Sequence, residues 1–174
     1  MWDFFKTVRH RHSVRKYQTD TTIEPEKLHA ILEMACAAPS AGDLQSYKII
    51  VVKNQETRDA LANAAENQTF IKEAPVSLVF CADPKRSEEK YGDRGVQLYA
   101  LQDATIAAAY AQLAIVAAGL ASTWVGFFDD AQVKTLLDIE EDFIPVAIIT
   151  IGYPAELPAP STRRRMDDIV ATIE

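Results

Sequence analysis

The chain has 174 residues and a mass of 19.3 kDa, which fits one domain, and its 48% hydrophobic residues exclude a disordered chain. Its net charge of −7 opposes binding along the phosphates of a nucleic acid, so we expect no nucleic-acid partner. The first residues lack the basic start and apolar stretch of an export signal, and a cytoplasmic location is expected.

Apolar residues at helical or alternating spacing predict a regular series of elements. In chain order these are helix 2–10, helix 25–38, strand 49–52, helix 56–65, strand 76–81, helix 96–118, strand 124–125, helix 132–137 and strand 146–151. Residues 83–95 are charged and contain two glycines, and we expect a mobile, irregular segment there. Three prolines beyond Gly152 oppose regular structure, so residues 155–174 are expected to form an extended arm on a neighbouring surface. Strands separated by unequal helices predict a single α+β or mixed-sheet α/β domain over residues 1–174.

The stretch 104–128 has no charged residue and is long enough to cross a bilayer. It is rich in alanine, is interrupted by polar side chains and is bordered by aspartates rather than by Lys or Arg. We therefore expect the buried central helix of a domain or of a subunit interface, and no membrane partner.

Basic residues gather at two places in an otherwise acidic chain. Residues 6–16 contain five Lys or Arg and no acid, and Arg163, Arg164 and Arg165 follow in the arm. Arginine offers planar, bidentate hydrogen bonds to oxyanions, so the two groups together suit one phosphate better than a polymer. A solvated basic surface remains the alternative on charge alone.

Several common chemistries are not indicated. The chain contains no GxGxxG and no GxxxxGK[ST], which opposes a Rossmann site and a P-loop. The three histidines have no metal-ligand spacing, and no metal site is expected. Cys36 and Cys81 fit neither a zinc pattern nor a redox pair, and both lie on apolar patterns, so we expect buried, inert thiols.

Three polar turns are candidates for ligand contacts. Residues 39–45 and 67–70 display short hydroxyl, carboxyl and amide side chains, although a helix-stop loop and a capped surface turn explain them equally simply. In residues 123–129, Gly126 permits the backbone to approach a flat ligand, whereas the alternative is a tight turn beneath packed aromatic rings.

Taken in order, these segments resemble the FMN-dependent nitroreductase family along nearly the whole chain. The matching motifs are residues 11–15, 38–45, 102–104, 119–126 and 151–154, followed by an Arg-x-Arg near the end. The resemblance implies a three-layer α-β-α fold with a mixed, largely antiparallel sheet and a long buried central helix. It also implies a homodimer with FMN at the interface and with the C-terminal arms exchanged.

The resemblance assigns roles to the two basic segments. The residues that match ligands of the FMN phosphate are Arg11, Ser13, Arg163 and Arg165. His12 would pack beside the ribityl chain or the ring. Arg15 would lie near N1 and the C2 carbonyl, where a cation stabilises the negative charge of the reduced ring.

The polar turns receive roles in the same way. The residues implied to reach FMN from the other subunit are Pro39, Ser40, Ala41 and Asp43. Asp43 stands where this family usually has Asn, which places a carboxylate near the flavin. Asn67 or Gln68 would bond the pyrimidine edge. The cofactor-binding stretch after the third strand is Val125, Gly126 and Phe127, with the backbone around Gly126 and Phe127 facing N5.

The implied activity is ping-pong hydride transfer through N5, from NAD(P)H to nitroaromatics, quinones, activated alkenes or flavins. Arg15, Gly126 and Phe127 are the residues expected nearest to this chemistry, and the segment 83–95 is expected to contribute to a lid. Two alternatives stay open, namely a protein that stores FMN without rapid turnover and a structural dimer without a ligand.

Overall fold

The computed structural model describes residues 3–174, so the first residue of the predicted helix 2–10 lies outside the described residues. The helices are α1 (Phe4–His10), α2 (Pro25–Cys36), α3 (Gln55–Ala64), α4 (Phe70–Glu73), α5 (Pro84–Arg94), α6 (Ala100–Ala117) and α7 (Asp130–Leu137). Short turns of helix are η1 (Ala41–Asp43), η2 (Gly95–Tyr99) and η3 (Met166–Asp168). The strands are β1 (Tyr47–Val52), β2 (Val76–Ala82), β3 (Ala121–Val125) and β4 (Ile144–Gly152).

The four strands form one sheet in the order β1-β2-β4-β3, and every neighbouring pair is antiparallel. A single parallel bridge joins Ser13 to Ser122 of β3. The predicted, largely antiparallel sheet is therefore confirmed, with no parallel pair among its four strands.

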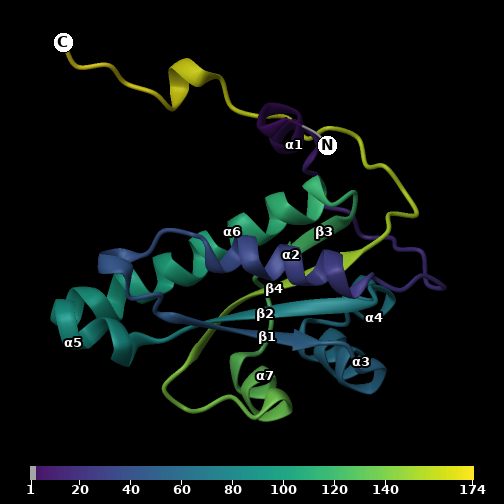
Figure 1. The fold of residues 1–174 in the computed structure, drawn as a ribbon, viewed down its shortest axis with the longest axis horizontal. Coiled ribbons are helices and arrows are strands. Elements are labelled where there is room, and N and C mark those ends of the chain that lie inside the picture. Colours follow the sequence, from purple (N-terminus) through teal and green to yellow (C-terminus); the bar gives the residue numbers. More distant parts are fainter. Residues whose placement is uncertain (1–2) are drawn as a thin grey trace.

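Helices cover both faces of the sheet, as Figure 1 shows. Alternate residues of β2 point to opposite faces. Leu78 and Phe80 pack with α2 and α6, whereas Val79 and Cys81 pack with α3, α4 and α7. Because both faces are covered, all of β2 is buried. The expected three-layer α-β-α fold is confirmed.

Helix α6 is the long central helix that the uncharged stretch predicts. Its alanines at positions 100, 104, 107, 108 and 111 are fully buried, which lets the helix lie close to the sheet. Gly119 follows it with φ of 77°, as expected for the residue that ends a helix. The continuous helical stretch Pro84–Ala117 is long and apolar enough to span a membrane by length and composition alone, and half of its apolar window is buried inside the protein.

The prediction for residues 83–95 is wrong, because this segment is ordered as α5 and the start of η2. Asp83 caps the helix by accepting a hydrogen bond from the Arg86 N–H, and Pro84 occupies the first turn. Gly92 interrupts the helix with φ of 55° rather than unfolding it. The four-residue helix α4 was not predicted, since one turn leaves no readable periodicity.

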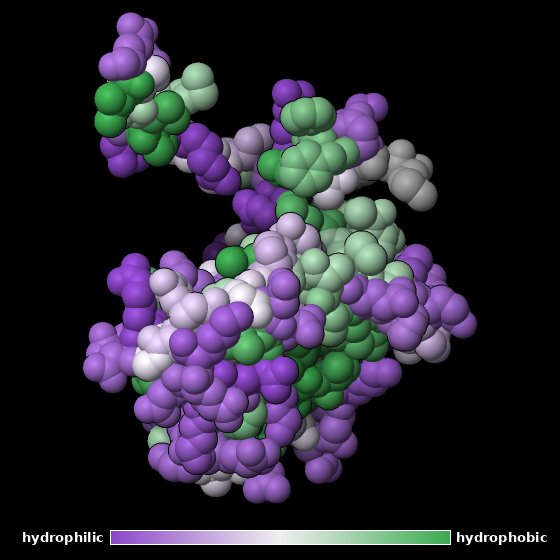
Figure 2. Space-filling model, turned by 60° about the vertical axis from the view of Figure 1, so that its left-hand side comes forward, coloured by the Kyte–Doolittle hydropathy of each residue, from purple (hydrophilic) through white to green (hydrophobic). Residues whose placement is uncertain are grey.

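The C-terminal arm leaves the body without joining the sheet. Its first residues pair with the N-terminal segment, since Ala155 N–H donates to the Lys16 carbonyl at 2.9 Å. Beyond that point the chain runs away from the body (Figure 1) and is exposed throughout residues 161–174. Figure 2 shows hydrophobic side chains on the parts that stand apart from the body. The large exposed apolar residues of α1 and the arm are Phe4, Phe5, Val8, Leu157, Met166, Ile169, Val170 and Ile173.

The expectation of two buried, inert thiols holds for one cysteine and is wrong for the other. Cys81 is fully buried, and burial raises the pKa of its thiol to about 11, so it is inert as predicted. Cys36, by contrast, is exposed. It is the last residue of α2 and lies next to the buried stripe of Leu28, Ile31 and Ala35 rather than on it.

We expect one reactive thiol per native chain with a chromogenic disulfide reagent at about pH 8, because only the thiolate reacts and Cys81 stays protonated and covered. Unfolding in denaturant should expose the second thiol, and Cys36→Ser should leave none in the native protein. Two rapidly reacting thiols in the native wild-type chain would contradict the packing around Cys81.

Candidate functional site

The basic segment 11–17 is fixed along the edge of β3. Val14 N–H donates to the Ser122 carbonyl at 3.1 Å, beside the Ser13–Ser122 bridge. The Thr123 hydroxyl donates to the Val14 carbonyl, so the main chain of Val14 is bonded on both sides. The segment that carries the predicted phosphate ligands is therefore held to the sheet.

Tyr17 anchors the other end of this segment. Its buried hydroxyl donates to the Val14 carbonyl at 2.7 Å and lies 2.6 Å from Thr150 Oγ1. Burial raises the pKa of Tyr17 to about 12, so the phenol stays neutral and remains a donor. Its ring packs directly over Gly152, where a Cβ atom would lie 2.7 Å from Tyr17 Cδ1.

Two guanidinium groups of this segment are not neutralised. Among residues 3–174, neither Arg11 nor Arg15 has an ion-pair partner, whereas the neighbouring Lys16 pairs with Glu156 at 3.7 Å. The guanidinium carbon of Arg15 lies 5.9 Å from the centre of the Phe70 ring, a cation–π arrangement. Phe70 belongs to α4, so the predicted segments 11–15 and 67–70 meet.

The third predicted segment joins the same group. Gln68 Nε2 donates to the Phe127 carbonyl at 3.3 Å and to the Ala65 carbonyl at 2.9 Å. Gly126 and Phe127 are exposed, and a Cβ atom at Gly126 would meet only the Trp124 side chain, at 3.5 Å. Asn67 is also exposed and adopts a left-handed conformation with φ of 57°.

Two predicted residues are oriented differently from the rest. The side chain of Val125 is buried in the core between the sheet and helices α3, α4 and α7, which leaves only its main chain for a ligand. His12 and Val14 line a pocket of about 310 Å³ between the C-terminal end of α6 and the start of the arm. In an extended segment, alternate side chains face opposite sides, so Arg11, Ser13 and Arg15 share the side away from that pocket.

The segment Pro39, Ser40, Ala41 and Asp43 lies elsewhere. It is bound to α6, because Asp103 accepts the Ala41 N–H at 2.9 Å, and to α5, because Lys90 Nζ lies 3.4 Å from the Gly42 carbonyl. It precedes β1, whose first residue pairs with the last residue of β2.

The two groups lie at opposite ends of the sheet within one protomer. The segments 11–17 and 67–70 are next to the start of β2, whereas residues 39–46 are next to its end (Figure 1). A strand of seven residues is about 20 Å long, so one protomer does not bring both groups to one small ligand.

The arginines of the arm are also apart from Arg11 in the protomer. Within the described part of the chain, Arg163 bonds only to neighbouring Ser161 and Thr162, and Arg165 pairs with Asp167 at 3.4 Å. Both are exposed. The structure of a single chain therefore does not bring the two basic groups together.

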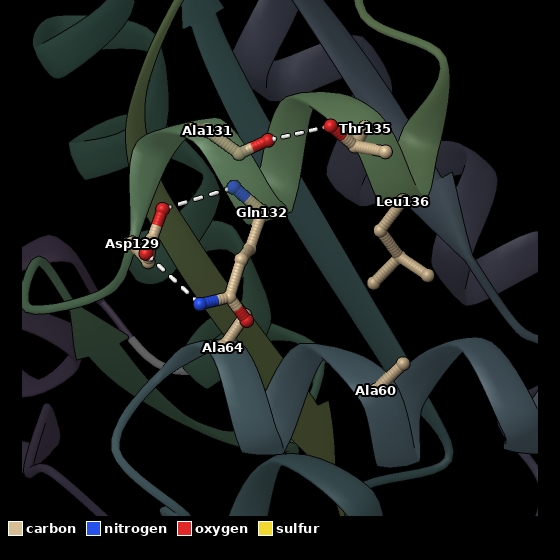
Figure 3. A pocket seen from close by; sticks show the side chains of 7 residues that line it. All are labelled: Ala60, Ala64, Asp129, Ala131, Gln132, Thr135 and Leu136. Carbon is tan, nitrogen blue, oxygen red and sulfur yellow. Dashed lines mark hydrogen bonds between the residues drawn. The ribbon is translucent and has the colours of Figure 1, made fainter.

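A second pocket is lined by none of the predicted ligands. Figure 3 shows a pocket of about 450 Å³ in which α7 faces Ala60 and Ala64 of α3. Its polar atoms serve the helix itself, since Asp129 accepts from the N–H and the amide of Gln132 at 2.9 Å each. Within residues 3–174, no group of three His, Cys, Asp or Glu side chains is arranged to hold a metal ion.

Comparison with known proteins identifies close relatives in sequence. A sequence model of the nitroreductase family matches residues 8–69 and 63–153. NADH dehydrogenase of Thermus thermophilus is 32% identical in an alignment that covers 92% of this chain and 91% of the relative. FMN reductase (NAD(P)H) of Bacillus subtilis is 29% identical in an alignment that covers 94% of this chain and 70% of the relative.

Solved structures give the same grouping. The NADPH:FMN oxidoreductase from Vibrio harveyi, solved as a complex with NAD+, superposes with a TM-score of 0.89 and 28% identity, covering 98% of this chain and 77% of that chain. A nitroreductase family protein from Streptococcus pneumoniae gives a TM-score of 0.88 and 26% identity, covering 98% of this chain and all of the other.

Proposed function

The chain belongs to the nitroreductase family, and from this membership we propose that it is an oxidoreductase that binds FMN and uses NAD(P)H to reduce electron-poor acceptors. The acceptor classes are nitroaromatics, quinones, activated alkenes and flavins. The observation that carries the proposal is the meeting of Arg15, Gln68 and Phe127 beside one edge of the sheet. The proposed unit is one domain over residues 1–174 in the cytoplasm, where its two free cysteines would stay reduced.

The chemistry of these residues fits FMN. Arg11 and Arg15 carry positive charges that no acid of residues 3–174 neutralises, which suits a phosphate and an electron-rich ring edge. The two N–H groups of the Gln68 amide donate to the Ala65 and Phe127 carbonyls, which leaves its oxygen to accept a hydrogen bond from the N–H of a pyrimidine edge. Among the described residues only the Trp124 side chain, at 3.5 Å, lies near a Cβ atom built at position 126, which leaves room for a flat ring above the main chain.

FMN held at this site would supply the redox chemistry, which is the transfer of two electrons from NAD(P)H to the acceptor. The role of the chain itself would be to bind FMN and to hold it in position. Arg15, held beside Phe70, favours the ring that carries more negative charge. The main chain at Gly126 and Phe127 would lie against the reacting edge of the flavin, and no side chain would have to act as a nucleophile.

The proposed assembly is a homodimer, because one protomer separates the residues that the site needs. A second copy related by twofold symmetry would bring residues 39–43 of one protomer to residues 11–15 of the other. The apolar side chains exposed on α1 and the arm supply surface for such an interface. An arm laid across the partner would also carry Arg163 and Arg165 toward the phosphate.

The region of selectivity is proposed to include α5. Arg86 donates to the Leu44 carbonyl and Lys90 approaches Gly42, so α5 lies directly behind residues 39–45. When that segment covers the partner's flavin, α5 borders the space that the acceptor enters. Its charged face would then help to decide which acceptors are reduced.

The experiment is anaerobic reduction of the protein loaded with FMN. We expect NADH or NADPH to bleach the visible absorbance of the bound flavin, and an added quinone or nitroaromatic compound to restore it. Colour that persists with both nicotinamides would identify a flavin-storage protein instead. A colourless protein whose unfolding temperature does not change with added FMN would contradict the proposal and favour a structural dimer.

A further inference from the structure

We propose that Asp103 of α6, assisted by Arg86 of α5, is a positioning residue for the flavin site of the partner subunit. This inference rests on the proposed function, in which residues 39–43 of one protomer lie against FMN held by the other. It adds that the shape of this segment is set by a buried carboxylate that does not itself touch the cofactor.

Both carboxyl oxygens of Asp103 accept hydrogen bonds from the main chain at and just after this segment. Asp103 is 1% exposed, its Oδ1 accepts the Ala41 N–H at 2.9 Å and its Oδ2 accepts the Ser46 N–H at 3.2 Å. No cation of residues 3–174 pairs with it. A buried carboxyl group needs hydrogen bonds to offset the loss of water, and the Ala41 and Ser46 N–H groups provide them.

The conformation that Asp103 holds is an unfavourable one. Gly42, Asp43 and Gln45 all have φ between 50° and 58°. This is the left-handed region of the backbone, which residues other than glycine rarely adopt. A segment with such residues persists only when its surroundings hold it. At Gly42 a side chain would also collide with Lys90 and Tyr91, so the segment is pressed against α5.

The two helices hold complementary groups of the same main chain. The acid on α6 takes N–H groups at positions 41 and 46, whereas Arg86 and Lys90 on α5 donate to the carbonyls of Leu44 and Gly42. The segment is thus bonded from both sides, with Asp43 between these bonds, and the Ser40 hydroxyl accepts the Gln45 N–H at 2.9 Å. An amide in place of Asp103 would offer one acceptor and would turn an N–H group toward another N–H group.

The first test is Asp103→Asn, with Asp20→Asn as a control that removes the same charge from an exposed position. We expect FMN to bind about tenfold more weakly to Asp103→Asn, because a loosened segment must be ordered again on binding. Asp20→Asn should bind FMN as the wild type does. Arg86→Met, which changes an exposed side chain and leaves the core intact, should weaken binding about threefold and serves as the second variant if Asp103→Asn does not fold.

Mixed dimers decide whether the effect acts on the partner. A dimer of one Arg15→Ala chain and one Asp103→Asn chain, purified through two different tags, would combine both defects in one site and leave the other site intact. We expect one site of wild-type affinity per mixed dimer and none in either parent dimer. The pair of Arg15→Ala with Arg86→Met should behave in the same way.

If Asp103→Asn only damaged the folding of its own protomer, the mixed dimer would not regain a site of wild-type affinity. If the mixed dimer has no site of wild-type affinity although the wild-type dimer binds FMN, Asp103 acts within its own protomer or on folding, and the inference is overturned. If the wild-type protein itself binds no FMN, the proposed function has failed instead.

Discussion

Arg15→Ala is expected to weaken FMN binding about a hundredfold, which corresponds to about 2.8 kcal/mol. The side chain is one of two guanidiniums of the basic segment without an acidic partner in residues 3–174, and Phe70 holds it in place. Removing it leaves the electron-rich edge of the flavin without its cation, so the reduction potential of bound FMN should fall as well. Titration calorimetry measures the first effect, and equilibration with a reference dye measures the second.

Lys16→Ala is the matched control, because Lys16 is the next residue, carries the same charge and already pairs with Glu156 at the surface. An exposed ion pair contributes little, so both the affinity and the potential should stay near the wild-type values. Equal losses in the two variants would mean that net charge, rather than a bond from Arg15, attracts the cofactor. Raising the salt concentration would then reduce binding to the wild-type protein as well.

Arg165→Ala examines the arm separately. Among residues 3–174 of one protomer, Arg165 pairs only with Asp167, so a loss of FMN affinity in this variant would indicate that the arm lies on a neighbouring chain. We expect a loss similar to that of Arg15→Ala, since a phosphate would lose one charge-assisted hydrogen bond. Unchanged affinity in both variants would show that FMN binds elsewhere.

The elements that could be predicted from the sequence are those with a strong hydrophobic pattern. The buried strands and α6 are almost wholly apolar, and their limits shift by only a few residues in the structure. Residues 83–95 have no such pattern, and their two glycines favour the prediction of an irregular segment. In the structure, however, Asp83 and Pro84 start helix α5. Local start signals decided this segment more than glycine content did.

The candidate site divides in a similar way. The segments 11–15, 67–70 and 123–129 carry charge or turn residues that can be recognised in the sequence, and the structure brings them together. The residues that hold them could not be predicted, because the bonds of Tyr17 to Thr150 and of Asp103 to Ala41 join positions far apart in the chain. A buried tyrosine or aspartate has no local sign of its partner.

Gly152→Ala is expected to destabilise the protein by about 1–3 kcal/mol and to weaken FMN binding together with stability. A Cβ atom there would lie 2.7 Å from Tyr17 Cδ1 and 2.9 Å from Pro75 Cδ, so the Tyr17 ring has to move. That ring bonds Val14 and thereby holds the segment of Arg11 and Arg15 against β3. Urea denaturation measures the stability, and titration with FMN measures the affinity.

Gly126→Ala is the matched variant, and we expect it to lower FMN affinity while leaving stability unchanged. Its new methyl group would meet only Trp124 at 3.5 Å, an ordinary contact, so the free energy of unfolding without ligand should stay near that of the wild type. The same methyl group would enter the space proposed for the flavin ring, and FMN affinity should fall about tenfold. If both variants lose stability but bind FMN with unchanged affinity, the two glycines serve packing alone. The flavin ring then does not lie at this turn. A loss of affinity confined to Gly126→Ala would instead place the ring at the turn and show that Tyr17 can shift without moving the arginines.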